Sequence, residues 1–302
     1  MSVAVLFPGQ GSAFAQGALE MLTGSPAAQA LLDRASAGAG IDLIRHLTRD
    51  GGADADTQIQ QPLIIAVCLG IYQRLKEVGF RPDLVAGHSL GELAAWSIAG
   101  GISAEQAVDL AVLRGRLMGR EAERHPGAMA VVKDGPALAD ILALGARHGQ
   151  IQVAAHNAPD EWVITGDRDA LDAIARRHAI VHLPVSGAWH SSKMAGAVDE
   201  FRQALKNVTK RPLTSRLVCN QTGLPVTDER TIPKLLATQL VQPIRWMHSM
   251  HTLADAGATT FVTIGPGKTL RAFIRKTLGA RVRVLSTETL PSLTRTIEAL
   301  VL

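Results

Sequence analysis

The sequence predicts an α/β fold in which helices cover both faces of a mostly parallel sheet and a small second domain interrupts the chain. Two observations predict it. Short apolar runs that end at glycine alternate with longer helical patterns, and the middle of the chain has a different order of elements. With 302 residues, 47% of them hydrophobic, the chain is long and apolar enough for one large domain that carries a smaller one.

The strands of the predicted sheet are short, β-branched and apolar. The run Val3–Phe7 ends at a Pro-Gly pair, as expected of a buried strand that enters a loop. Glycine also follows the runs at 84–86, 163–165 and 261–264. Helical patterns occupy 62–78 and 103–123, and the second opens with Ser103 and Gln106 at the spacing of a capping box. This alternation favours parallel strands joined by helices.

The segment 125–186 has the order strand, helix, strand, strand, helix, strand, which is the split-βαβ order of a ferredoxin-like domain. Its predicted elements are residues 127–133, 135–149, 151–157, 161–166, 167–179 and 180–186. We therefore predict a discontinuous core domain, 1–124 and 187–302, into which a ferredoxin-like domain at 125–186 is inserted.

Composition argues against several classes of protein. The formal charge is +4 and the pI is near 9.3, but Lys and Arg are scattered and only 4% of residues are aromatic. Nucleic-acid binding is therefore disfavoured, and an acidic protein partner fits better. The chain has no stretch of about 18 charge-free apolar residues, the length that a membrane-spanning helix needs. Its first residues do not resemble a signal peptide. We expect a soluble, cytoplasmic protein.

No metal and no permanently bound cofactor is expected. Cys68 and Cys219 lie in no CxxC or CxxH pair, and we interpret both as reduced structural residues. His248 and His251 are three residues apart on a predicted helix, but no third ligand accompanies them. The segment GPGKT resembles the end of a phosphate loop, yet Val262 occupies the place of the first glycine, which argues against an NTPase.

The pentapeptide GHSLG, residues 87–91, places Ser89 between an apolar run and an alanine-rich helical pattern. A strand, Gly-x-Ser-x-Gly and a helix together are typical of a nucleophile elbow, whose glycines permit a strained turn that presents the serine hydroxyl. The alternative is an ordinary serine at the start of a helix. We favour the nucleophile, because the helix N-terminus would also supply backbone N–H donors to an oxyanion, that of Leu90 first.

A serine nucleophile requires a base. His190 follows the last predicted strand of the small domain, where the chain re-enters the core, and is the first choice. His248 and His251 are its rivals. A serine hydrolase with the order Ser, acid, His would favour this later pair, and no Asp or Glu is a compelling third member of a triad.

Arg114 lies in a helical pattern that is apolar nearly all round, on one face with Leu110 and Met118, so its guanidinium is expected to point inward. Two interpretations are open. It forms a structural ion pair with a carboxylate of this chain, or it binds the carboxylate of a substrate through two parallel hydrogen bonds.

Seven segments, in order along the chain, resemble the malonyl-CoA:acyl carrier protein transacylase family of fatty acid and polyketide synthesis. They are FPGQGS, GHSLGE, LRGRLM, GAMAVV, VSGAWHS, QLVQPIRW and IGPGKTL, and they extend from residue 7 to residue 270. The family fold is a hydrolase-like α/β core with a ferredoxin-like insertion, in agreement with the elements predicted above.

The resemblance implies roles for individual residues. Ser89 would be acylated, His190 would act as base and then as acid, and Arg114 would hold the malonyl carboxylate. The backbone N–H groups of Gln10 and Leu90 would form the oxyanion hole. These roles imply ping-pong transfer from malonyl-CoA to the phosphopantetheine thiol of an acyl carrier protein, with the coenzyme A thioester as substrate.

Further positions follow from the same resemblance. The backbone carbonyl of Gln239 would orient the histidine, and Met118 and Trp189 would contact the acyl group. Trp189 replaces the usual phenylalanine and predicts a smaller pocket. The chain also departs from the family after GQGS, where residues 13–16 read Ala-Phe-Ala-Gln. Carriers of a malonate decarboxylase or of a polyketide assembly line remain alternative acceptors, and a serine esterase or thioesterase is the alternative reaction.

Overall fold

The core of the protein is a five-stranded sheet in which every pair of neighbours is parallel. The computed structural model describes residues 2–11, 18–50 and 56–301, so the departure at residues 13–16 lies outside the described residues. The strands, in spatial order, are β7 (Arg216–Val218), β2 (Leu84–Gly87), β1 (Ser2–Phe7), β8 (Ala258–Thr263) and β9 (Arg283–Ser286). The prediction of a mostly parallel sheet is confirmed.

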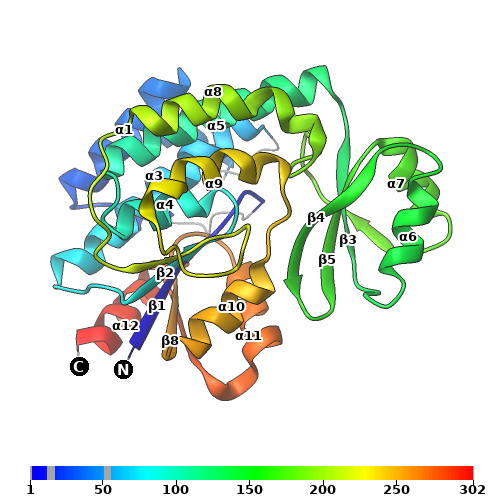
Figure 1. The fold of residues 1–302 in the computed structure, drawn as a ribbon. Coiled ribbons are helices and arrows are strands. Elements are labelled where there is room, and N and C mark those ends of the chain that lie inside the picture. Colours follow the sequence, from blue (N-terminus) through cyan, green and yellow to red (C-terminus); the bar gives the residue numbers. More distant parts are fainter. Residues whose placement is uncertain (1, 12–17, 51–55, 302) are drawn as a thin grey trace.

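Helices cover this sheet on both faces. The chain moves from β1 to β2 and β7 in one direction and from β8 to β9 in the other, so right-handed crossovers place their helices on opposite faces. Figure 1 shows α3, α5 and α8 together on one side and α10 and α11 apart from them. The helices are α1 (Pro26–Ala39), α2 (Leu43–Asp50), α3 (Thr57–Glu77), α4 (Gly91–Ile98), α5 (Ala104–Arg124), α8 (Ala195–Asn207), α9 (Ile232–Thr238), α10 (Trp246–Asp255), α11 (Thr269–Leu278) and α12 (Leu290–Val301).

Short 3-10 turns complete the core: η1 (Ala18–Met21), η2 (Ser192–Met194), η3 (Glu229–Thr231), η4 (Gln239–Val241) and η5 (Gly279–Arg281). The strand order reverses at β1, whose neighbours β2 and β8 are reached by crossovers in opposite directions. In open α/β sheets such a switch point opens a crevice outside the carboxyl ends of the strands. The fold therefore places the loops after β1 and β2 side by side.

Helix α3 begins at Thr57, where the sequence had indicated a start at Pro62. Proline is commonest in the first turn, because it has no N–H to leave unpaired there. Here the side chain of Asp56 caps the helix by accepting a hydrogen bond from the N–H of Gln58 at 2.8 Å. Pro62 is therefore an interior residue, and the continuous burial of residues 60–72 offsets the hydrogen bond that it cannot make.

Helix α5 has the predicted capping box at its start. The Ser103 hydroxyl accepts a hydrogen bond from the N–H of Gln106 at 3.2 Å, and the Gln106 side chain accepts one from the N–H of Ser103 at 3.1 Å. Its buried face includes Leu110, Arg114 and Met118, as the four-residue spacing indicated. The helix thus places a guanidinium inside the core.

The small unit, at the right of Figure 1, is a four-stranded antiparallel sheet with two helices on one face. Its strand order, β4-β5-β3-β6, is that of a ferredoxin-like fold. The helices shield a separate core that includes Ile141, Ile164 and Leu171. The elements are β3 (Ala128–Val132), α6 (Leu138–Gly145), β4 (Ile151–Ala158), β5 (Glu161–Gly166), α7 (Arg168–Ala175) and β6 (Ile180–His182). The boundaries 124/125 and 186/187 stay a prediction.

The small sheet is joined to the core by backbone hydrogen bonds. The N–H of His156 donates to the carbonyl of Ile244 at 2.9 Å, and the N–H of Ile244 donates to the carbonyl of Ala154 at 2.9 Å. Strand β4 therefore lies directly beside the segment that precedes α10. The open face of the small sheet is turned toward the carboxyl ends of the core strands.

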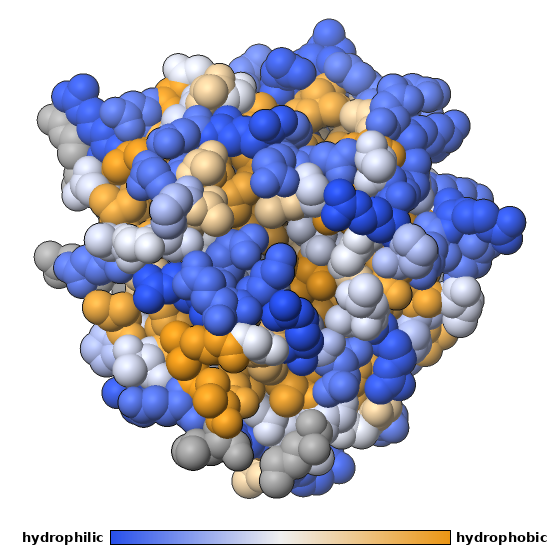
Figure 2. Space-filling view, turned by 90° about the vertical axis from the view of Figure 1, so that its left-hand side faces the viewer, coloured by the Kyte–Doolittle hydropathy of each residue, from blue (hydrophilic) through white to orange (hydrophobic). Residues whose placement is uncertain are grey.

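The outer surface on the side of α1 and the chain ends is mainly hydrophilic, with apolar side chains gathered toward its lower edge (Figure 2). Among the described residues, no helix has the length and apolar character needed to cross a membrane.

The turn between β2 and α4 depends on two glycines. A Cβ atom on Gly87 would lie 1.9 Å from the carbonyl carbon of Gly91, and a Cβ atom on Gly91 would lie 2.5 Å from the carbonyl oxygen of Phe7. Both distances are far inside van der Waals contact, and both clashes are with backbone. The elbow therefore packs against the end of β1 only because neither position has a side chain.

We expect Gly87→Ala to lower the free energy of unfolding by about 3 kcal/mol or more, because backbone must move to admit the methyl group. Gly135→Ala is the matched control, since its Cβ would meet the Trp162 Nε1 atom at 3.3 Å and little else. Urea unfolding followed by circular dichroism measures both. Equal midpoints for the two variants would contradict the packing argument.

Candidate active site

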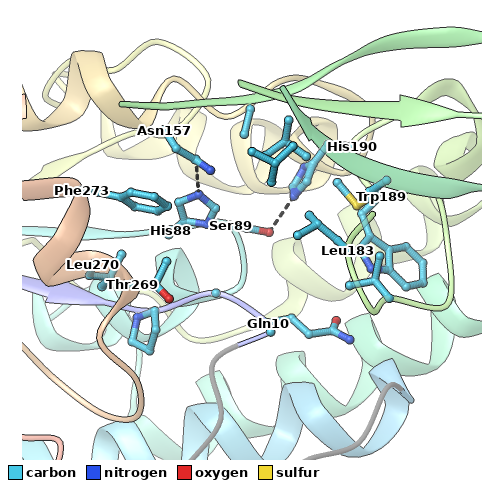
Figure 3. A pocket seen from close by; sticks show the side chains of 18 of the residues that line it. Gln10, His88, Ser89, Asn157, Leu183, Trp189, His190, Thr269, Leu270 and Phe273 are labelled. Carbon is cyan, nitrogen blue, oxygen red and sulfur yellow. Dashed lines mark hydrogen bonds between the residues drawn. The ribbon is translucent and has the colours of Figure 1, made fainter. Parts of the chain in front are cut away.

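A cavity of about 230 Å³ lies between the carboxyl ends of β1 and β2 and the open face of the small sheet. The loop after β1, the elbow, β3 to β5, the segment after β6 and the start of α11 all line it. Figure 3 shows the Ser89 hydroxyl and the His190 ring pointing toward each other, with Gln10 below them, Phe273 at the left and Trp189 at the right. Its other lining residues include Arg114, Met118, Asn157, Leu183 and Trp189.

Ser89 and His190 form a hydrogen-bonded pair although 100 residues separate them in the chain. The Ser89 Oγ and His190 Nε2 atoms are 2.7 Å apart, and His190 Nδ1 lies 2.8 Å from the backbone carbonyl oxygen of Gln239. A carbonyl oxygen only accepts, so Nδ1 must hold the proton. Nε2 is then free to accept the serine hydroxyl, which is the tautomer that a general base requires.

Both members of this pair have strained backbones. Ser89 has φ of 49° and His190 has φ of 58°, and they are the only residues other than glycine with positive φ in the described part of the chain. The left-handed region costs an ordinary residue about 1 to 3 kcal/mol and is retained where surrounding structure enforces it. The two strained positions are therefore the two residues whose side chains hydrogen-bond to each other at the cavity.

Asn220, which the sequence did not single out, holds the elbow in place. Its Oδ1 accepts a hydrogen bond from the N–H of Ser89 at 2.6 Å, and its Nδ2 donates to the carbonyl of Gly87 at 2.6 Å. Asn220 is fully buried and follows β7, the strand beside β2. It therefore satisfies both backbone groups that the strained turn exposes.

Arg114 reaches the pair from α5. Its Nη2 atom donates to Ser89 Oγ at 3.2 Å and to Gln239 Oε1 at 3.0 Å, and its Nη1 atom donates to Gln61 Oε1 at 2.8 Å. The side chain is only 2% exposed, and no carboxylate of the described residues forms an ion pair with it. The structural ion pair considered for Arg114 is therefore wrong: uncharged amides hold the guanidinium.

Burial lowers the pKa of Arg114 to about 10, and the nearby Glu92 carboxyl opposes this shift. The guanidinium still carries its charge at neutral pH. Gln61 was also missed by the sequence analysis. Its Nε2 atom donates to Thr57 Oγ1 at 2.7 Å and to Met118 Sδ at 3.3 Å, which fixes the amide with its oxygen toward Arg114.

The candidate oxyanion donors lie on two neighbouring segments. Leu90 occupies the N-cap of α4, and within the described residues its N–H has no acceptor, whereas the N–H of Ser89 is already bound to Asn220. Gln10 lines the cavity from the loop after β1, and its side chain accepts a hydrogen bond from Thr57 at 2.9 Å. That loop can pass close to the elbow because Gly9 has no side chain: a Cβ there would lie 2.9 Å from His88 Nδ1.

His88 spans the two parts of the site. Its Nε2 atom lies 2.9 Å from the Asn157 Oδ1 atom of β4, and its ring packs edge-on against Trp246 with centroids 5.2 Å apart. Burial lowers its pKa, so a neutral imidazole donates to the Asn157 oxygen. This contact holds the small sheet against the elbow.

Of the remaining predicted residues, some line the cavity and others lie outside it. Met118 and Trp189 are both buried and both line it. The rivals of His190, His248 and His251, are on α10 and do not line the cavity. Across residues 2–11, 18–50 and 56–301, no cluster of His, Cys, Asp and Glu could hold a metal ion.

The two cysteines are buried thiols away from the cavity lining. Burial raises the pKa of Cys219 to about 12 and that of Cys68 further, so both stay protonated at neutral pH. They are structural residues, as the sequence indicated.

The chain is similar to known proteins over nearly its whole length. Residues 5–301 match the family described as the acyl transferase domain. The malonyl CoA-acyl carrier protein transacylase of Mycobacterium tuberculosis is 34% identical over 91% of this chain and 93% of its own length, and that of Bacillus subtilis is 32% identical over 91% and 90%. Among solved structures, a malonyl-transacylase in complex with a type II polyketide synthase acyl-carrier protein superposes with a TM-score of 0.89 at 28% identity, covering 99% of this chain and all of that one.

The α/β core with its hydrogen-bonded serine–histidine pair and buried arginine is thus the fold of an acyltransferase. The chain belongs to the acyl transferase domain family.

We predict that the His190 imidazole remains neutral throughout the physiological range. Burial, followed by the charge of Arg114, lowers its pKa to about 3. An unfolded histidine takes up a proton near pH 6.5 and folded His190 does not, so its contribution to stability is lost as pH falls from about 6.5 toward 3. The ¹⁵N shifts of His190, assigned by comparison with His190→Gln, should not move between pH 5.5 and 8. A midpoint inside that range would contradict the assignment of a buried, neutral base.

Proposed function

We propose that this protein transfers a malonyl group from malonyl-CoA to the phosphopantetheine thiol of an acyl carrier protein, through an ester on Ser89. One observation carries the proposal. A buried arginine without an ion-pair partner among the described residues touches the hydroxyl of a serine that is paired with histidine. Acyl transfer needs the serine and the histidine, and an acyl group that ends in a carboxylate needs the arginine. The names of the relatives point to the same reaction.

The first half of the reaction loads the enzyme. Ser89 Oγ attacks the thioester carbonyl while His190 Nε2 takes the hydroxyl proton, and the backbone N–H groups of Leu90 and Gln10 stabilise the oxyanion. The C–S bond then breaks, and His190 returns the proton to the departing coenzyme A thiolate. The products are a malonyl ester and free coenzyme A.

The second half repeats these steps with another thiol. The phosphopantetheine thiol of the carrier protein gives its proton to His190 and attacks the ester carbonyl, and Ser89 leaves with the proton that His190 hands back. One narrow cavity cannot hold both thiols at once, so the kinetics are ping-pong. A carrier thiol, stronger as a nucleophile than water, completes the transfer.

Arg114 selects the acyl group. To bind a malonyl carboxylate it turns from Ser89 Oγ toward the substrate and keeps Gln61 and Gln239 as lateral supports. A neutral acetyl group leaves the buried cation without a carboxylate in contact with it, and a missing partner of this kind costs about 3 to 5 kcal/mol. Trp189 is bulkier than phenylalanine and narrows the cavity beside His190. We therefore expect malonyl groups with a substituent on Cα to be poorer substrates.

Intact mass spectrometry tests the ester directly. After mixing with malonyl-CoA, the protein should gain one malonyl group and lose it again when a holo-carrier protein is added. Ser89→Ala should gain nothing, because the attacking oxygen is gone. The matched control is Ser97→Ala, the same substitution near the C-terminal end of α4. This variant should gain the malonyl group as the unaltered protein does. A malonyl adduct that persists in Ser89→Ala would overturn the proposed intermediate.

The selectivity of Arg114 is a separate prediction. We expect malonyl-CoA to be used at least about 100-fold better than acetyl-CoA, which corresponds to roughly 2.7 kcal/mol. Arg114→Ala should lower kcat/KM for malonyl transfer and narrow this ratio, whereas Arg116→Ala, an exposed arginine on the same helix, should leave it unchanged. The ratio comes from competition between the two thioesters with the carrier protein held limiting. Equal use of both thioesters by the unaltered enzyme would contradict the proposed role of Arg114 in binding the malonyl carboxylate.

A further inference from the structure

The buried carboxylate of Glu92 lies behind the site and does not line the cavity. Glu92 is in the first turn of α4, three residues after Ser89, and is 3% exposed. No Lys, Arg or His among the described residues forms an ion pair with it. A buried, unpaired carboxylate is costly, and its environment must contain donors that compensate.

One backbone N–H and one side-chain amide donate hydrogen bonds to the carboxylate. The N–H of Asn220 donates to Glu92 Oε1 at 3.1 Å, and the Nε2 atom of Gln239 donates to Glu92 Oε2. Asn220 is the residue that holds the N–H of Ser89 and the carbonyl of Gly87. One arm of Glu92 therefore supports the elbow that presents the nucleophile.

The other arm supports the base and the cation. The carbonyl oxygen of Gln239 accepts from His190 Nδ1, its side-chain oxygen accepts from Arg114, and its Nε2 atom also donates to the carbonyl of Ser89 at 3.1 Å. Gln239 thus contacts each of the three residues that meet in the cavity. Glu92 is the carboxylate that accepts from both Asn220 and Gln239, the two residues that also bind the backbone of Ser89.

The chemistry of the carboxylate decides which way Gln239 faces. An ionised carboxylate only accepts, so it draws the amide nitrogen of Gln239 toward itself and turns the amide oxygen toward Arg114. A neutral glutamine at position 92 would present an N–H of its own to one of the two arms. Either the Asn220 N–H or the Gln239 amide would then meet a donor instead of an acceptor.

We propose that Glu92 is a positioning residue that holds the nucleophile arm, through Asn220, and the base-and-cation arm, through Gln239, in one arrangement. Its effect on Ser89 and His190 needs no particular acyl group. Its effect on Arg114 and acyl selection rests on the proposed malonyl transfer. Glu92 also places a negative charge near Arg114 without occupying the guanidinium, which leaves that group free for a substrate carboxylate.

The proposal implies a dependence on pH. Burial raises the pKa of Glu92 to about 7, and the Asn220 N–H, the Gln239 amide, the Cys219 thiol and the charge of Arg114 oppose the shift. Arg114 and Cys219 are the titratable groups that face it. Above this pKa the carboxylate orients both arms; below it the proton needs an acceptor that neither arm provides while Gln239 keeps its orientation.

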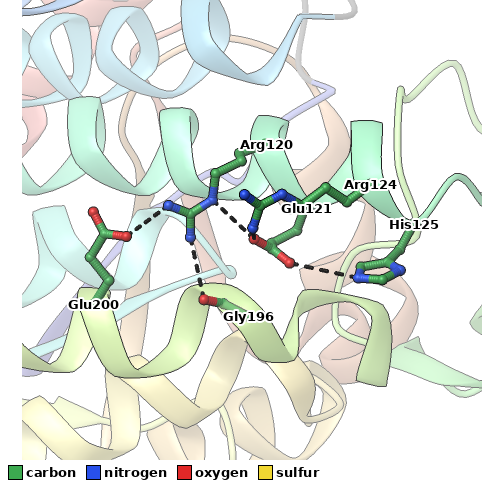
Figure 4. A network of polar contacts seen from close by, with 6 residues as sticks. All are labelled: Arg120, Glu121, Arg124, His125, Gly196 and Glu200. Atoms are coloured by element: carbon green, nitrogen blue, oxygen red, sulfur yellow. Dashed lines mark hydrogen bonds and ion pairs between the residues drawn. The ribbon is translucent and has the colours of Figure 1, made fainter.

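Glu92→Gln tests the proposal, with Glu121→Gln as the matched control. Glu121 is equally buried, at 1% exposed, but its carboxylate binds Arg120, Arg124 and His125 where α5 meets α8 (Figure 4), and it does not line the cavity. Two readouts apply to each protein: the rate at which a fluorophosphonate labels Ser89, from pH 5.5 to 9, and the ratio of malonyl to acetyl loading.

In the unaltered enzyme, labelling should slow as pH falls through about 7. Glu92→Gln should label at least tenfold more slowly at pH 8, lose that pH dependence and narrow the loading ratio, while Glu121→Gln keeps all three. A purely structural role would change the melting temperature and leave the pH profile in place. Unchanged labelling and selectivity in folded Glu92→Gln would overturn the proposal.

If Glu92→Gln does not fold, Gln239→Leu tests the proposal in its place. It keeps the backbone carbonyl on His190 and cuts the link from Glu92 to Arg114. The loading ratio should narrow by at least fivefold, and an unchanged ratio would overturn the proposal. Fluorophosphonate labelling does not depend on malonyl chemistry. An unaltered enzyme that labels at Ser89 but takes no malonyl group would therefore refute the proposed function and leave the result for Glu92 standing.

Discussion

The contact between the elbow and the end of β1 constrains the rest of the site. Because Gly91 lies against the carbonyl of Phe7, the turn after β2 can bend sharply enough to force Ser89 into the left-handed region. The bend exposes backbone groups, which Asn220 then satisfies from the neighbouring strand. The geometry of Ser89 thus depends on the glycine positions, which permit this close approach, and on the strand order, which places Asn220 beside the turn.

The predictable parts of this protein are those that depend on local chemistry. The spacing of apolar residues and the glycines that end the apolar runs were sufficient to predict the parallel sheet and the ferredoxin-like order. The capping box located the start of α5. The start of α3 was wrong, because Pro62 resembles a first-turn proline while Asp56 provides the actual cap. The Gly-x-Ser-x-Gly pattern located Ser89 for the same local reason.

Residues placed by tertiary contacts gave no such signal. Asn220, Gln61 and Glu92 are ordinary polar residues in the sequence, and each acquires its place only when distant segments pack together. Arg114 was visible as a cation in an apolar helix, but whether a carboxylate neutralised it depended on neighbours from α3 and η4. Burial can be inferred from periodicity, whereas a hydrogen-bond partner across the fold cannot.

The acceptor behind His190 is a peptide carbonyl where many serine enzymes have a carboxylate. A carboxylate there would place a second anion within reach of Arg114, compete with an acidic acyl group for that cation and repel it. A dipole orients the imidazole without adding net charge. In the proposed reaction, the imidazolium that forms then has no anion hydrogen-bonded to it, which favours its rapid return of the proton to a departing thiolate. Under the proposed function, His190 is a weaker base, and the positive charge of Arg114 remains available to the carboxylate of the acyl group.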